Sequence, residues 1–97
     1  MNEAEAMRRD YNRRVGEQAR LLREAQGLSL RQLEARALER GIRGISFSLI
    51  GLLERGETDW GPSYLARMAV ALGVSMRELT AGQYRQEHSP PILTQAS

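Results

Sequence analysis

Apolar residues recur at helical spacing along most of the chain, and this spacing predicts a series of short α-helices. The first predicted helix runs from about Asn12 to Gln26, and Gly27 ends it because glycine tolerates a left-handed backbone. Its inward face is predicted to hold Val15, Ala19 and Leu22. Residues 1–11 are polar and alternately charged, so this N-terminal extension either lengthens the helix or stays frayed.

A capping pattern opens the second predicted helix. Ser29 is followed by Gln32 three residues later, and this pair predicts a helix from Leu30 to about Glu39. The inward residues of this helix are Leu33 and Ala37. Residues 41–44 include two glycines, which are unfavourable in a helix, and therefore predict a turn.

A third helix is predicted from Phe47 to Glu54, with Ser46 as its N-cap and Gly56 just beyond its end. Its inward residues are Ile50 and Leu53. Residues 57–61 contain no helical repeat and predict a loop before the next element.

Two more helices follow the loop. Pro62 and Ser63 open the fourth, because proline is well tolerated in a first helical turn, and Gly73 ends it. The stripe on this helix consists of Leu65, Ala69 and Leu72. Ser75 with Glu78 repeats the capping pattern for a last short helix.

These elements predict an all-α fold of five short helices that ends near Gly82. Residues 83–97 hold two prolines and little periodicity, so they predict an extended or disordered tail. The second and third helices and their glycine-containing turn form a helix-turn-helix unit, whose second member can enter the major groove of DNA. Periodicity alone does not distinguish this unit from part of another small helical bundle.

Composition narrows the class of protein. The 97 residues have the length of one domain, and the absence of cysteine excludes disulfide and thiol chemistry. No apolar run approaches the roughly 18 residues of a membrane span, and the N-terminus is acidic where a signal peptide would be basic. We therefore expect a cytoplasmic protein.

Positive charge is distributed unevenly, although the net charge is only +2. Residues 1–43 hold ten basic and seven acidic residues, whereas the rest of the chain holds four basic and five acidic ones. Every basic residue is arginine. Codon bias in a GC-rich genome explains this choice, and so does phosphate binding, because the arginine fork matches phosphate oxygens. The two explanations are compatible.

Three stretches carry a resemblance to a known family. They are Val15-Gly16 with Ala19-Arg20, Leu22-Arg23 and Gly27-Leu28-Ser29; Gly44-Ile45-Ser46 with Ile50, Leu53 and Glu54-Arg55-Gly56; and Pro62-Ser63 with Leu65, Ala69, Leu72-Gly73-Val74-Ser75 and Glu78-Leu79. In this order and spacing the chain resembles the XRE family, the DNA-binding domain of phage repressors and Cro-like regulators. The resemblance implies a five-helix lambda-repressor-like domain over residues 12–82.

The resemblance places base contacts at the start of the third helix and one turn later. These base-facing positions are Ser46, Phe47, Ser48, Gly51 and Leu52. No Arg, Asn or Gln stands there to form a bidentate bond with a base edge. Phe47 and Leu52 either pack on thymine methyl groups or bury against the long loop or a partner, and Gly51 allows close backbone approach. A DNA-binding site with few side chains that hydrogen-bond to base edges selects its DNA through phosphate contacts, bridging water and DNA shape.

The resemblance also implies phosphate contacts from helix N-termini and nearby donors. The candidates are Ser29, Arg31, Gln32, Arg40, Arg43 and Arg55. The family often carries glutamine where Leu30 stands, so Arg31 and Gln32 are expected to replace that contact.

Two segments are longer than the family pattern. The stretch from Leu33 to Gly44 exceeds it by about six residues, and lengthens either the second helix or the turn. Within it, Arg40 and Arg43 either reach phosphates or keep a long loop soluble. The loop after Gly56 contains Trp60, whose indole either caps the core or donates to a phosphate.

Glu54 stands at the negative end of a helix, where a lone carboxylate is unfavourable. The resemblance pairs it with Arg23 of the first helix. Such an ion pair would hold the first helix against the third.

We expect a sequence-selective regulator that binds double-stranded DNA as a homodimer, acting in the nucleoid to repress a phage, mobile-element or toxin–antitoxin operon. The alternative is a protein-interaction module with Phe47, Leu49 and Leu52 as an apolar docking patch. No enzyme, cofactor or metal site is predicted, because the one histidine, His88, stands alone in the tail, no serine has a His/Asp partner pattern, and no glycine-rich loop suits a nucleotide. That tail is also a candidate site for a protein partner.

Overall fold

Residues 1–81 are described in a computed structural model of the chain, and they form five α-helices. The helices are α1 (Glu3–Ala25), α2 (Leu30–Glu39), α3 (Phe47–Glu54), α4 (Pro62–Leu72) and α5 (Met76–Leu79). The predicted all-α class with five helices is therefore confirmed. Residues 82–97, with the predicted tail and His88, lie outside the described residues.

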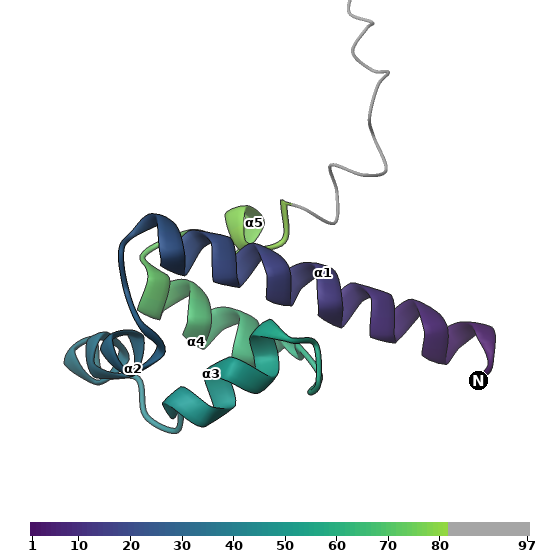
Figure 1. Cartoon of the computed structure of the whole chain (residues 1–97), viewed down its shortest axis with the longest axis horizontal. Helices are drawn as coiled ribbons and strands as arrows, with labels where there is room; N and C mark the ends of the chain where they lie inside the picture. Colours follow the sequence, from purple (N-terminus) through teal and green to yellow (C-terminus); the bar gives the residue numbers. More distant parts are fainter. Residues whose placement is uncertain (82–97) are drawn as a thin grey trace, which may run out of the picture.

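Helix α1 starts at Glu3 rather than near Asn12, so the N-terminal extension lengthens the helix instead of fraying. Asn2 caps it, because its side chain accepts the N–H of Glu5 at 2.8 Å and the Glu5 carboxylate accepts the N–H of Asn2 at 3.3 Å. The first turns of α1 project beyond the other helices (Figure 1). Residues 1–9 are exposed, and Arg8 forms a solvent-exposed ion pair with Asp59 at 3.6 Å in the loop after α3.

Helices α2 and α3 have the predicted bounds. Between them, residues 40–46 form a loop that turns at Gly41 and Gly44, whose φ angles of +80° and +82° disfavour residues with a side chain. Because α2 ends at Glu39 as predicted, the additional length of this segment lies in the loop.

Helices α4 and α5 follow from their capping signals. Pro62 is the first residue of α4, and Gly73 closes that helix in a left-handed conformation. Ser75 caps α5 by accepting the N–H of Glu78 at 3.0 Å. The side-chain amide of Gln18 donates to the carbonyl of Glu78 at 3.1 Å and ties α5 to α1.

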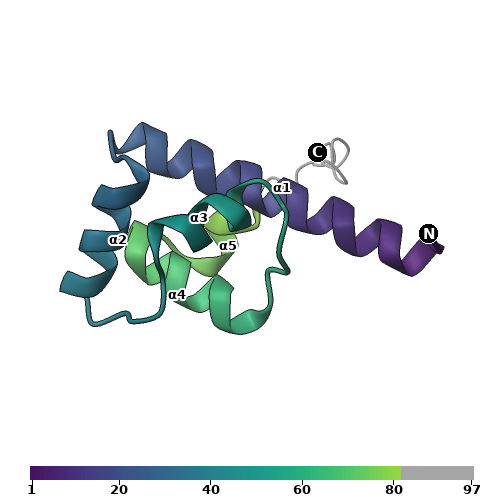
Figure 2. The ribbon, with the colours of Figure 1, turned by 60° about the horizontal axis from the view of Figure 1, so that its bottom comes forward.

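The five helices enclose one core. Its buried members are Val15, Ala19, Leu33, Ala37, Ile45, Ile50, Leu53, Trp60, Met68, Ala69, Ala71, Leu72 and Leu79. Helix α3 packs against α1 and α2, and α2 lies across one end of α1 and α4 (Figures 1 and 2). No helix within residues 1–81 combines the length and apolar character needed to cross a membrane.

Candidate nucleic-acid interface

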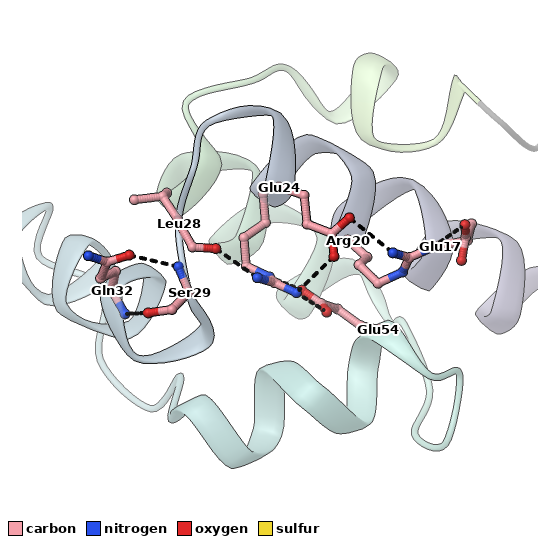
Figure 3. A network of polar contacts seen from close by, with 8 residues as sticks. Glu17, Arg20, Glu24, Leu28, Ser29, Gln32 and Glu54 are labelled. Atoms are coloured by element: carbon pink, nitrogen blue, oxygen red, sulfur yellow. Dashed lines mark hydrogen bonds and ion pairs between the residues drawn. The ribbon is translucent and has the colours of Figure 1, made fainter.

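A largely buried ion pair joins α3 to α1. Arg23 Nε donates to Glu54 Oε2 at 2.7 Å and Arg23 Nη2 to Glu54 Oε1 at 2.9 Å, with 11% and 6% of the two side chains exposed. This hydrogen bonding raises the pKa of Arg23, although burial opposes the shift. Arg23 Nη1 also donates to the Leu28 carbonyl at 2.7 Å, so one guanidinium joins α1, the α1–α2 connection and α3 (Figure 3).

Gly16 allows α1 to cross very close to the end of α3. A Cβ atom at this position would lie 2.3 Å from the carbonyl oxygen of Leu53 and 2.5 Å from that of Glu54. Any larger residue would push the two helices apart, because backbone atoms cannot give way as a side chain does. Gly16 and Arg23 therefore set the position of α3 from the same helix.

The N-terminus of α2 lies beside α3 and is capped without acidic residues. Ser29 Oγ accepts the N–H of Gln32 at 3.1 Å, and Gln32 Oε1 accepts the N–H of Ser29 at 2.8 Å (Figure 3). Both side chains are exposed. Within residues 1–81, the other N–H groups of this first turn and the Gln32 side-chain NH₂ form no hydrogen bond, so they can donate to an anion.

The outer face of α3, which we define by Phe47, Ser48 and Leu52, points away from the core. Ser48 is exposed, Leu52 is 37% exposed and Phe47 is half-buried. Ser46 caps the helix by accepting the N–H of Leu49 at 3.1 Å. This face is mostly apolar, in agreement with the sequence pattern.

Gly51 does not belong to the exposed face, contrary to the expectation that it allows close backbone approach. It is buried, and a Cβ atom there would lie 3.2 Å from Arg55 Nη1 and 3.8 Å from Leu30 Cδ1. Leu30 and Arg55 thus cover the backbone of α3 at this position. A Cβ atom at residue 51 would make an ordinary contact with Leu30 and a tight one only with the flexible end of Arg55.

Arg31 stacks on the aromatic residue of the outer face. Its guanidinium carbon lies 4.0 Å from the centroid of the Phe47 ring, within the range of a cation–π contact. The contact links the first turn of α2 to the first turn of α3. Arg31 therefore holds Phe47 and keeps a positive charge at the edge of the outer face.

The described geometry is that of two helices in a helix-turn-helix unit, and a family comparison agrees. The family model described as helix-turn-helix matches residues 20–79, which is more than half of the chain. The chain belongs to the XRE-like helix-turn-helix family. Its members are DNA-binding regulatory domains rather than enzymes, so the chain is in general terms a DNA-binding transcription regulator. No curated protein and no solved structure matches it.

In this XRE-like domain, two exposed arginines flank α3 at its two ends. Arg55 directly follows α3, and its side chain is 59% exposed beside Glu57 at 3.2 Å. Arg43 lies in the loop before α3, and its side chain is also exposed. Both side chains are therefore accessible to solvent next to the ends of α3.

Arg40 has a different role from the predicted phosphate contact. Its Nη1 donates to the carbonyl oxygens of Val70 at 3.0 Å and Ala71 at 3.1 Å in the last turn of α4, and the Val70 carbonyl also accepts the backbone N–H of Gly73. The guanidinium thus caps α4 and complements its negative pole. The Arg40 side chain thus joins two helices, whereas the Arg43 side chain is exposed to solvent.

Trp60 belongs to the core of the XRE-like domain rather than to its DNA-facing surface. It is buried, and its indole Nε1 donates to the Leu53 carbonyl at 2.8 Å. Its backbone N–H donates to Asn12 Oδ1 at 3.0 Å, while Asn12 Nδ2 donates to Asp59 at 2.8 Å. Asn12 therefore shapes the loop after α3, a role that the sequence-based prediction missed. The position of Asn12 in the sequence could have indicated this role, because it lies one helical turn before Gly16 on the inward face of α1.

Proposed function

We propose that this XRE-like protein binds double-stranded DNA sequence-selectively, with α3 in the major groove, and represses a phage, mobile-element or toxin–antitoxin operon. The main observation in support of this proposal is that the outer face of α3 lies between the N-terminus of α2 and the exposed Arg55. An α-helix with side chains is about 10–12 Å across, which matches a major groove about 12 Å wide.

The residues around α3 divide into those that would contact bases and those that would contact phosphates. Base edges would meet the outer face at Phe47, Ser48 and Leu52, with Ser46 at its edge. Phosphates would meet the N-terminus of α2 and the flanking side chains, namely Ser29, Arg31, Gln32, Arg43 and Arg55. Arg40 is left out because its guanidinium caps α4, and Gly51 because it is buried under Leu30 and Arg55 and contributes only backbone to this surface.

A homodimer is part of the proposal for a geometric reason. The eight residues of α3 span only about 12 Å, which corresponds to about three to four base pairs at 3.4 Å each. So short a helix reads too few positions to select one operator alone. Two copies on half-sites about one helical turn apart would double the number of positions read.

The test is fluorescence anisotropy with a labelled 24-base-pair duplex of mixed sequence, followed from 50 to 200 mM salt. Affinity should fall steeply, because phosphate contacts release counterions. Arg55→Ala should weaken binding to every duplex and flatten the salt slope by about one unit. Arg77→Ala on α5, which packs against α1 and α4, is the matched control and should leave binding unchanged. Absence of binding at low salt would contradict the proposal.

The alternative protein-docking patch is smaller than the sequence suggested. Leu49 packs against the core, and one face of Phe47 carries Arg31. Of the three residues of this patch, Phe47 and Leu49 are half-buried and Leu52 is 37% exposed. The positive rim around the outer face favours a polyanion over an apolar protein surface.

A further inference from the structure

The outer face of α3 contains a shallow depression with an apolar lining. Its lining residues are Leu30, Phe47, Ser48, Gly51, Leu52 and Arg55, and its volume is about 350 Å³. We name it the α3 depression. Apart from the Ser48 hydroxyl and the Arg55 guanidinium, its side chains are hydrocarbon.

Positive charge borders this depression on two sides. The Arg31 guanidinium lies on the Phe47 ring at one side, and Arg55 covers Gly51 at the other, where Glu57 is its ion-pair partner. An apolar lining between two arginines complements a ligand that has an apolar group flanked by negative charges. The major groove of DNA presents that combination, with phosphates along both edges.

The base pairs offer one apolar group in the major groove, the C5-methyl of thymine. Guanine, adenine and cytosine present hydrogen-bond donors and acceptors there, which would lose water against Phe47 and Leu52, and in the lining only the Ser48 hydroxyl and the Arg55 guanidinium offer a replacement. Ser48 is the one lining side chain of the depression with a hydroxyl. The lining therefore rewards thymine and disfavours polar base edges.

We propose that the α3 depression receives thymine methyl groups, and that this protein selects its DNA site by the positions of thymines. Leu52 and Phe47 are the specificity-determining contacts, and Arg31 is a positioning residue that holds the Phe47 ring. This inference rests on the proposed DNA-binding function and defines which bases that function prefers.

The decisive experiment removes methyl groups and nothing else. A duplex that the full-length protein enriches from a random library is remade with deoxyuridine in place of each thymine in turn. At one or two positions per half-site, affinity should fall about fourfold, the value for one buried carbon group. Replacement at the other thymines should leave affinity unchanged.

Protein variants connect that effect to the depression. In Leu52→Ala or Phe47→Ala, uracil and thymine duplexes should bind equally, because the methyl group has lost its contact. Leu38→Ala on α2 is the matched control, since Leu38 is an exposed leucine outside the depression, and the thymine preference should persist. Arg31→Gln should reduce the preference while a second phosphate-facing variant, Arg43→Gln, should not.

Two negative outcomes are distinguishable. Salt-dependent DNA binding with equal affinity for thymine and uracil duplexes, or with no enriched sequence, would overturn the methyl-reading proposal and leave the DNA-binding function standing. Absence of salt-dependent binding to any duplex would overturn the proposed function itself, and the inference with it.

Discussion

Arg40, at the end of α2, donates a hydrogen bond to the carbonyl oxygen of Val70 at 3.0 Å and so closes the C-terminus of α4. The same nitrogen lies 3.1 Å from the Ala71 carbonyl. Arg40, which lies in the segment that exceeds the family pattern, thus joins the end of α2 to the end of α4. Arg43, three residues later in the loop, has an exposed side chain that forms no hydrogen bond to α4 within residues 1–81.

These two arginines should separate stability from DNA binding. Arg40→Met should lower the free energy of unfolding by about 1 kcal/mol, because two carbonyls lose a charged donor at a helix end. Arg43→Met should leave stability within about 0.5 kcal/mol and weaken DNA binding. Urea denaturation and duplex anisotropy measure the two effects. The reverse pattern would mean that Arg40 faces DNA.

The ion pair between Arg23 and Glu54 should be costly to break. Glu54→Ala should lower the free energy of unfolding by about 3 kcal/mol or more, because it leaves a largely buried guanidinium without its partner. Removing the exposed Glu57, which pairs with Arg55, should cost less than about 1 kcal/mol and is the control for thermal denaturation. Similar losses in both variants would contradict the structural importance of the buried pair.

The raised pKa of Arg23 determines how this pair responds to pH. A group whose pKa is raised on folding stabilises the native state below its unfolded pKa and loses that contribution only as pH rises through the folded pKa. For an arginine both values lie far above neutrality. Between pH 6 and 9, the difference in stability between the Glu54→Ala variant and the wild type should therefore stay constant in urea titrations. A steep change in this window would show that another group controls the pair.

The sign of the stability change at Gly16 tests the close crossing of α1 and α3. Alanine in place of glycine inside a helix ordinarily stabilises it by about 0.5–1 kcal/mol. Here the added Cβ would meet two backbone carbonyls, so Gly16→Ala should destabilise the protein by about 1–3 kcal/mol. Thermal denaturation decides the sign, and a stabilised variant would exclude the tight crossing.

The projecting end of α1 should unravel without affecting the core. Asn2→Ala removes the capping box, so amides of residues 3–9 should exchange faster with solvent. Global stability should change little, since these residues are exposed. Ser46→Ala removes the cap of α3 in the core and should instead cost about 1 kcal/mol overall. A large global effect of Asn2→Ala would show that the projecting turns are packed against something.

The bounds of α2 and α3 and the caps at Ser29, Ser46 and Ser75 could be predicted because the signals are local. A capping side chain bonds a backbone group two or three residues away, and helical periodicity places inward residues within one turn of each other. The N-cap at Asn2 followed the same rule with Glu5, but the polar composition of residues 1–11 hid it. Local chemistry was sufficient to determine that cap as well.

The sequence by itself determined the five helices and the family, because both depend on spacing along the chain. It also determined that the outer face of α3 is poor in polar side chains. Only the tertiary structure decided the contacts between side chains and distant parts of the chain. Arg40 bonds to the end of α4, Arg31 stacks on Phe47, Asn12 accepts the backbone N–H of Trp60, and Leu30 covers Gly51. Those contacts join residues far apart in sequence or on different helices, so their geometry follows from how the helices pack and not from any local pattern.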